Sequence, residues 1–203
     1  MTATNTSDSA QGILLQSADS SPATLTVNGG ELTASGQRAG IKYVFGSSGT
    51  GDGTPTVTVS GNAIVRANGG ISDDSSTDIQ IGADSNESNG GIVFDGKNGT
   101  VYGAVTLQED LEIGEGESLT LDDGASLNAG NHNVIVDGGT LDESIANSLG
   151  DSVKYAPTIV APPADKSVTE GETATFTVNA TGTEPLSYLC LLYTSPSPRD
   201  STS

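Results

Sequence analysis

The side chains with the clearest chemistry in this 203-residue chain are carboxylates, since Asp and Glu number 26 against 7 Lys and Arg. Ca²⁺ takes roughly six to eight oxygen ligands, which carboxylates and turn carbonyls can supply. The calcium candidates are four aspartates on one turn-rich stretch: Asp73, Asp74, Asp78 and Asp84. Their spacing matches neither an EF-hand nor a Gly-rich calcium-binding nonapeptide. Solvated corners are the alternative interpretation of these acidic residues.

Aromatic side chains indicate a second kind of site, because an apolar ring face can cover the face of a sugar. The ligand-binding candidates are Tyr43, Phe45, Phe94 and Tyr102. Each could equally belong to the hydrophobic core or to its edge, and the sequence leaves both interpretations open.

No catalytic residue can be assigned from the sequence. His132 is the single histidine, and no second His or Cys accompanies it as a zinc ligand would. A Gly-x-Ser-x-Gly elbow, a P-loop and a His-Glu-x-x-His motif are all absent from the sequence. Acid–base catalysis needs two carboxyls across a cleft, whereas adjacent pairs such as Asp122-Asp123 are typical of solvated corners. We therefore expect no catalytic site and no cofactor other than the candidate Ca²⁺.

The net charge of −19 excludes nucleic acid as a partner, because nucleic-acid binding requires clustered Lys and Arg. No apolar run approaches the roughly 20 residues of a membrane-spanning helix, so we expect no membrane span. The first residues also lack the basic and apolar regions of a signal peptide. Nothing in the sequence indicates the oligomeric state.

The elements that must position these residues are short repeated strands. Leu25–Leu32 is echoed at 57–64 and 134–141, with partial copies from Ile79 and Val105, at a mean spacing of about 27 residues. A Gly-Ile pair recurs at 12, 40, 70 and 91. Each period holds about three alternating strands, which close a core only when successive periods stack. Parallel stacking would place the first apolar residue of each copy in one inward ladder.

Residues 111–127 carry an eight-residue pattern of two consecutive units, which begin at Leu111 and Leu119, as expected for the flat sides of a triangular solenoid. A β-sandwich built from the same short strands is the alternative fold. These motifs resemble the right-handed parallel β-helices of secreted bacterial proteins, a family with pectate-lyase-like, adhesin-type and carbohydrate-binding members. The resemblance implies an all-β solenoid over 11–142, after an N-terminal extension at 1–10 and before a short helical cap and connector at 143–156.

Residues 157–189 resemble the opening of a bacterial immunoglobulin-like domain. The matching motifs are Val-Thr-Glu-Gly from Val168, the alternating Ala-Thr-Phe-Thr-Val from Ala174, and Pro-Leu-Ser-Tyr ending at Tyr188. The family's inward Trp should follow two residues later, where Cys190 stands instead. We expect only the first strands of this incomplete sandwich, so 157–203 should not form a stable domain.

The end of the sequence, CLLYTSPSPRD from Cys190 to Asp200, resembles a translated sequencing adapter. We expect 190–203 to be non-native, as in a truncated gene from environmental DNA, and exclude it from the fold. This exclusion removes the only cysteine and with it any disulfide.

Taken with these resemblances, the sequence predicts a non-catalytic fragment of a large exported bacterial surface protein. The fragment would be stalk-like or adhesin-like, located outside the cell or at its surface, and would bind a glycan or a host-surface ligand. The alternative is a fragment of a β-helix polysaccharide lyase or glycoside hydrolase.

Overall fold

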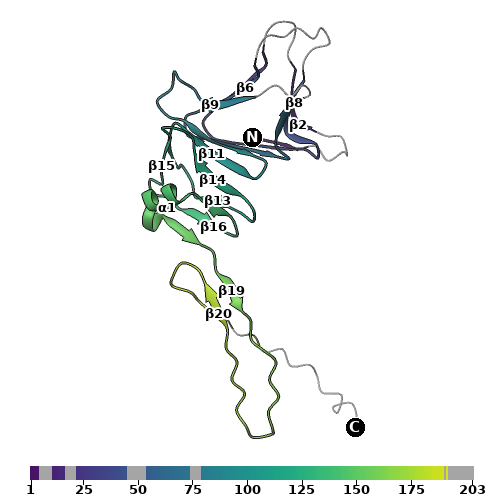
Figure 1. Cartoon of the computed structure of the whole chain (residues 1–203), viewed down its shortest axis with the longest axis vertical. Coiled ribbons are helices and arrows are strands. Elements are labelled where there is room, and N and C mark those ends of the chain that lie inside the picture. The colour runs from purple at the N-terminus through teal and green to yellow at the C-terminus, as the bar shows by residue number, and fades with distance from the viewer. Residues whose placement is uncertain (5–10, 17–21, 45–53, 74–78, 190, 192–203) are drawn as a thin grey trace. The chain divides into compact units, whose positions relative to one another are not determined.

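The structure is a computed structural model that describes residues 1–4, 11–16, 22–44, 54–73, 79–189 and 191. The chain divides into two compact units, 1–156 and 157–203. The fold is all-β, with several parallel sheets and a single short helix in the described residues (Figure 1).

A seven-stranded sheet runs through the whole first unit, and we call it the central sheet. In spatial order its strands are β1 (Thr2–Thr4), β4 (Glu31–Ser35), β7 (Ala63–Asn68), β10 (Gly91–Asp95), β11 (Asn98–Tyr102), β14 (Ser118–Leu121) and β17 (Thr140–Leu141). All neighbouring pairs are parallel except β10 and β11, which form an antiparallel hairpin.

Before the hairpin, the chain makes three circuits through the central sheet and two further parallel sheets. The first consists of β2 (Gln11–Gln16), β5 (Ala39–Val44) and β8 (Ile71–Asp73), and the second of β3 (Thr24–Asn28), β6 (Thr56–Ser60) and β9 (Gln80–Ala83). We call this part the N-terminal stack.

After the hairpin, the chain again circulates through the central sheet and two other parallel sheets, which we call the C-terminal stack. One sheet contains β12 (Ala104–Thr106) and β15 (Ser126–Asn128), and the other contains β13 (Leu111–Ile113), β16 (Val134–Val136) and β18 (Val153–Tyr155). In the last circuit α1 (Glu143–Leu149) and the 3-10 turn Gly150–Ser152 replace a third strand beside β15.

The two stacks place their hydrophobic cores on opposite faces of the central sheet. On β10, Val93 packs into the N-terminal core, while its neighbours Ile92 and Phe94 pack into the C-terminal core. Val65 and Ile64 of β7 divide in the same way. Because successive side chains of a strand point to opposite faces, the hairpin both reverses the strand direction and moves the core across the sheet.

The expected parallel stacking is confirmed for the first repeats, since Leu25 pairs with Val57 in parallel register. The expectation of one continuous ladder is wrong. Its third residue is Ile81 rather than Ile79, and Val105 and Val134 lie in two other sheets. The hairpin causes this difference, because no strand beyond it continues the β3-β6-β9 sheet.

The Gly-Ile pairs mark the corner between the central sheet and the β2-β5-β8 sheet. Ile13 pairs with Ile41, and Ile41 pairs with Ile71, so three of the four pairs form one ladder. A Cβ atom at Gly40 would lie 2.5 Å from the backbone carbon of Ala67, which leaves no space for a side chain at this corner.

The ends of the first unit contain strands that the sequence does not indicate. Residues 2–4, assigned above to an extension, form β1 and pair with β4. In the segment 143–156, α1 buries Ile145 beneath the C-terminal stack, and β18 then adds a strand beside β16. Asp142 caps α1 by accepting a hydrogen bond from Ser144 N. The hydrogen bond from the Ser144 hydroxyl, together with this backbone bond, lowers the pKa of the Asp142 carboxyl.

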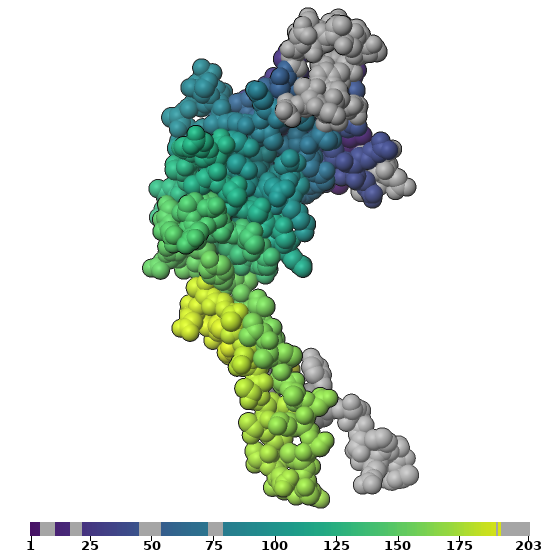
Figure 2. Space-filling view, in the orientation of Figure 1, coloured from purple at the N-terminus to yellow at the C-terminus, as the bar shows by residue number. Residues whose placement is uncertain are grey.

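The second unit contains one antiparallel pair, β19 (Thr158–Ala161) with β20 (Asn179–Thr181), and no other strand among its described residues. Its large apolar side chains stay exposed, including Phe176 at 60% and Tyr188 at 63%. Figure 2 shows the described residues of this segment as a thin strip, whereas the first unit is a thicker body. Of the adapter-like residues, Cys190 and 192–203 lie outside the described residues.

Candidate functional site

The structure places two of the aromatic candidates in the core rather than on a sugar-binding face. Tyr43 and Phe94 are each 1% exposed, Tyr43 in the N-terminal core and Phe94 in the C-terminal core. Tyr102 is half-buried against the N-terminal core, and Phe45 lies outside the described residues. Both buried rings lie on strands whose apolar residues close the stacks, so packing determines their position.

The buried Tyr43 hydroxyl gives a pH-dependent prediction. It donates a hydrogen bond to the carbonyl oxygen of Thr56, and burial raises its pKa to about 12. The neutral form is therefore favoured in the folded state, so its contribution to stability is full below pH ~10 and is lost as pH rises toward 12. Ultraviolet titration of tyrosinate should show one tyrosine ionising together with unfolding. The absorbance change that accompanies unfolding should be absent in Tyr43→Phe, which would assign it to Tyr43. Ionisation of every tyrosine near pH ~10, without unfolding, would contradict the burial of Tyr43.

Of the four calcium candidates, only Asp84 has a side chain that the structure describes. The carboxylate of Asp84 accepts hydrogen bonds from the backbone N (2.9 Å) and side-chain amide (3.0 Å) of Asn86 within its own turn. Asp73 ends β8, and Asp74 and Asp78 lie outside the described residues. Among the residues that are described, no group of three or more His, Cys, Asp or Glu side chains could hold a metal.

His132 lies at a turn, with its Nδ1 3.6 Å from Oδ1 of Asp110. The same carboxylate oxygen accepts a hydrogen bond from the backbone N of Asn133 at 2.8 Å. His132 and Asp110 therefore hold the corner that leads into β16.

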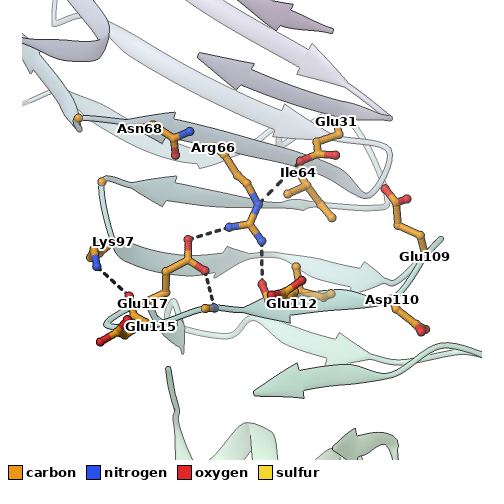
Figure 3. Close-up of a pocket in the computed structure, with 14 residues that line it drawn as sticks. Glu31, Ile64, Arg66, Asn68, Lys97, Glu109, Asp110, Glu112, Glu115 and Glu117 are labelled. Carbon is orange, nitrogen blue, oxygen red and sulfur yellow. Dashed lines mark hydrogen bonds and ion pairs between the residues drawn. The ribbon is translucent and has the colours of Figure 1, made fainter. Parts of the chain in front are cut away.

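A groove of the described surface lies where the C-terminal stack begins. Figure 3 shows this groove between the outer face of β4 and β7 and the first strand of the neighbouring sheet, β13. Its volume is about 830 Å³. The polar and charged side chains that line it are Glu31, Arg66, Asn68, Lys97, Glu109, Asp110, Glu112, Glu115 and Glu117. Its lining residues come from β4, β7, the turn between β10 and β11, and the segment 109–117.

Arg66 occupies the middle of this groove and is only 19% exposed. Its guanidinium lies over the ring of Phe94, 4.0 Å from the centroid. One nitrogen donates to Oε1 of Glu117 at 2.9 Å, and another donates to the carbonyl oxygen of Glu112 at 2.8 Å. A carboxylate oxygen of Glu31 lies 3.8 Å from its Nε. Arg66 thus covers Phe94 at the end of the C-terminal core, and Glu117 and Glu31 balance its positive charge.

The edge strand β13 presents backbone groups to the groove. Leu111 and Ile113 direct their backbone groups to β16, as the bonds from Leu111 N to Asn133 O and from Asp137 N to Ile113 O show. In a parallel pair the intervening residue points the other way. The N–H and C=O of Glu112 therefore face the groove, where Arg66 takes the carbonyl.

The remaining charges make the groove strongly acidic. Six carboxylates line it against two basic side chains, Arg66 and Lys97. Lys97 is engaged as well, since its Nζ donates to the carbonyl oxygen of Glu115 at 2.7 Å. Glu117 also accepts a hydrogen bond from Gly114 N, which ties the loop before β14 to the groove wall.

Sequence reasoning did not bring these residues together in one site. Arg66 and Glu117 are 51 positions apart, and only the stacking of circuits brings them together. One signal was present, because Arg66 interrupts the otherwise apolar run of β7, Ala63-Ile-Val-Arg-Ala67. A charged residue inside a run buried on both faces needs a partner in the fold.

No known protein family matches the chain, and neither a curated protein nor a solved structure shows significant similarity to it. In the part of the chain that the structure describes, no helix has both the length and the apolar character to cross a membrane.

Proposed function

We propose that the first unit is a right-handed parallel β-helix, a rigid and non-catalytic module of an exported bacterial surface protein. The parallel ladders support this proposal most strongly, since β2, β5 and β8 stack in register through Ile13, Ile41 and Ile71. Parallel crossovers in one sheet are right-handed in nearly all proteins. At the hairpin the strand direction reverses and the core moves to the other face of the central sheet. These two reversals cancel, so the chain winds in the same sense before and after the hairpin.

Stacked circuits suit a stalk or an adhesin, because each circuit is hydrogen-bonded to the next along several sides and shares its core. The net charge of −19 keeps such modules apart in solution. The second unit supplies the first strands of an immunoglobulin-like module in series with the first unit. The ligand of the assembly is a glycan or another host-surface component, outside the cell, and the groove around Arg66 is its binding site.

The experiment is to incubate the chain with neutral, amino and acidic polysaccharides, with and without Ca²⁺, measuring both binding and cleavage. We expect binding of at least one glycan, with no unsaturated or reducing-end products formed. Unsaturated products would replace this proposal with the polysaccharide-lyase alternative, and new reducing ends alone would indicate a hydrolase. A heat-unfolded sample of the same chain controls for contaminating enzymes and for non-specific binding.

A further inference from the structure

The chemistry of the groove restricts which glycans it can bind, an inference that rests on the proposed function. We propose that the groove binds saccharides carrying free amino groups and rejects acidic saccharides. The groove is large enough for several sugar residues, and its lining decides between glycans by charge and by hydrogen-bond character.

The exposed side chains of the lining are mainly acceptors. Glu31, Glu109, Glu112 and Glu115 are exposed around the groove, and a carboxylate can only accept hydrogen bonds. A ligand that fits must therefore be rich in donors. Sugar hydroxyls meet this requirement in part, whereas an ammonium group brings three donors and a positive charge.

The cations that could attract an acidic ligand are already committed. Arg66 is held by Glu117, by the Glu112 carbonyl and by the Phe94 ring. Lys97 is held by the Glu115 carbonyl. Because the lining carries six carboxylates against two basic side chains, a uronate-containing chain would meet net repulsion.

Arg66 also shows directly that this groove accommodates a cation. Its guanidinium is held by a carboxylate, a strand-edge carbonyl and an aromatic face at once. Further carboxylates line the groove around Arg66, including those of Glu112 and Glu115. An amino sugar placed there would extend the same set of interactions (Figure 3).

The test is titration calorimetry of the whole chain with three probes at low salt: a β-1,4-linked glucosamine oligomer, its N-acetylated counterpart and an oligogalacturonate. We expect the glucosamine oligomer to bind at least roughly tenfold more tightly than the N-acetylated form, as two charge-assisted contacts would give. The difference should shrink at high salt, and the oligogalacturonate should not bind. The double variant E112Q/E115Q should remove the preference for the amine.

The matched control is D122N/D123N, which removes two exposed carboxylates outside the groove and changes the net charge equally. Equal loss of affinity in this control would mean non-specific attraction to an acidic chain, and would overturn the inference. Equal or tighter binding of the N-acetylated oligomer would also overturn it while leaving the proposed glycan function in place. If none of the three probes binds, both the preference for amino sugars and the proposed glycan-binding function are contradicted.

Discussion

Replacing Val57 by Asp is expected to abolish the stable fold of the first unit. Val57 is completely buried in the N-terminal core and stands between Leu25 and Ile81 in its ladder. The new carboxylate would have no cationic partner there, because the cluster around it is apolar. Burying an unpaired charge costs on the order of 4 kcal/mol or more, which is comparable with the whole stability of many domains.

The matched control is Thr58→Asp on the same strand. Thr58 is half-buried and points away from the core, since the inward residues of β6 are Val57 and Val59. Urea unfolding followed by circular dichroism should leave the Thr58 variant within about 1 kcal/mol of the parent, whereas the Val57 variant should be unfolded without urea. Similar midpoints for the two variants would show that β6 does not face a core.

The sequence contained enough information to predict the strands and their parallel stacking in the N-terminal stack. The Gly-Ile pairs predict the stacking because each combines two requirements of one corner. The glycine stands where a Cβ atom has no space, as at Gly40, and the isoleucine pairs with the isoleucine of the next circuit, as at Ile41. The eight-residue pattern was equally informative. Leu111, Leu119 and Leu127 lie on the consecutive strands β13, β14 and β15, which belong to three different sheets.

The hairpin was missed although its signal was present. Asp95-Gly96 directly follows the apolar run Ile92-Val93-Phe94, and an Asp-Gly pair beside a strand is a strong hairpin signal. The apolar run Ile92-Val93-Phe94 also differs from every one-sided strand, because both of its faces are buried. The mean repeat length alone predicts a single ladder, because spacing carries no information about strand direction. The turn at Asp95-Gly96 carries that information, and the structure contradicts the single ladder.

The candidate site could be predicted less well than the fold. Aromatic side chains were selected for their chemistry, but a chain with only 8 Phe and Tyr residues and no Trp uses Tyr43 and Phe94 to fill its cores. The groove draws its lining from separate segments of the chain, which no local pattern encodes. The sequence predicts that the surface is acidic as a whole, from the excess of Asp and Glu over Lys and Arg, but it does not predict that six carboxylates gather in one groove.

Gly90→Ala is the second change expected to have a large effect, because Gly90 fixes the place where the chain changes face. Its N donates to the carbonyl of Ala104 at 2.7 Å, and its own carbonyl accepts from Asn62 N at 2.8 Å. A Cβ atom at this position would overlap the carbonyl oxygen of Tyr102 and would lie 2.7 Å from the carbonyl carbon and 3.1 Å from Cα of Gly103. All three neighbours are backbone atoms, so no flexible side chain can move aside.

The expected cost of Gly90→Ala is about 3 kcal/mol, the upper range of overpacking in a rigid site, and it should appear as a lower urea midpoint. Gly82→Ala is the matched control, since a Cβ there would meet no atom within 4 Å and Gly82 has no positive φ. That variant should stay within about 0.5 kcal/mol of the parent, because the folded state loses nothing and the unfolded chain loses entropy. If both alanine variants unfold at the same midpoint, β10 does not enter the central sheet against the Tyr102–Gly103 corner, and the crossing of the core from one face to the other must be placed elsewhere.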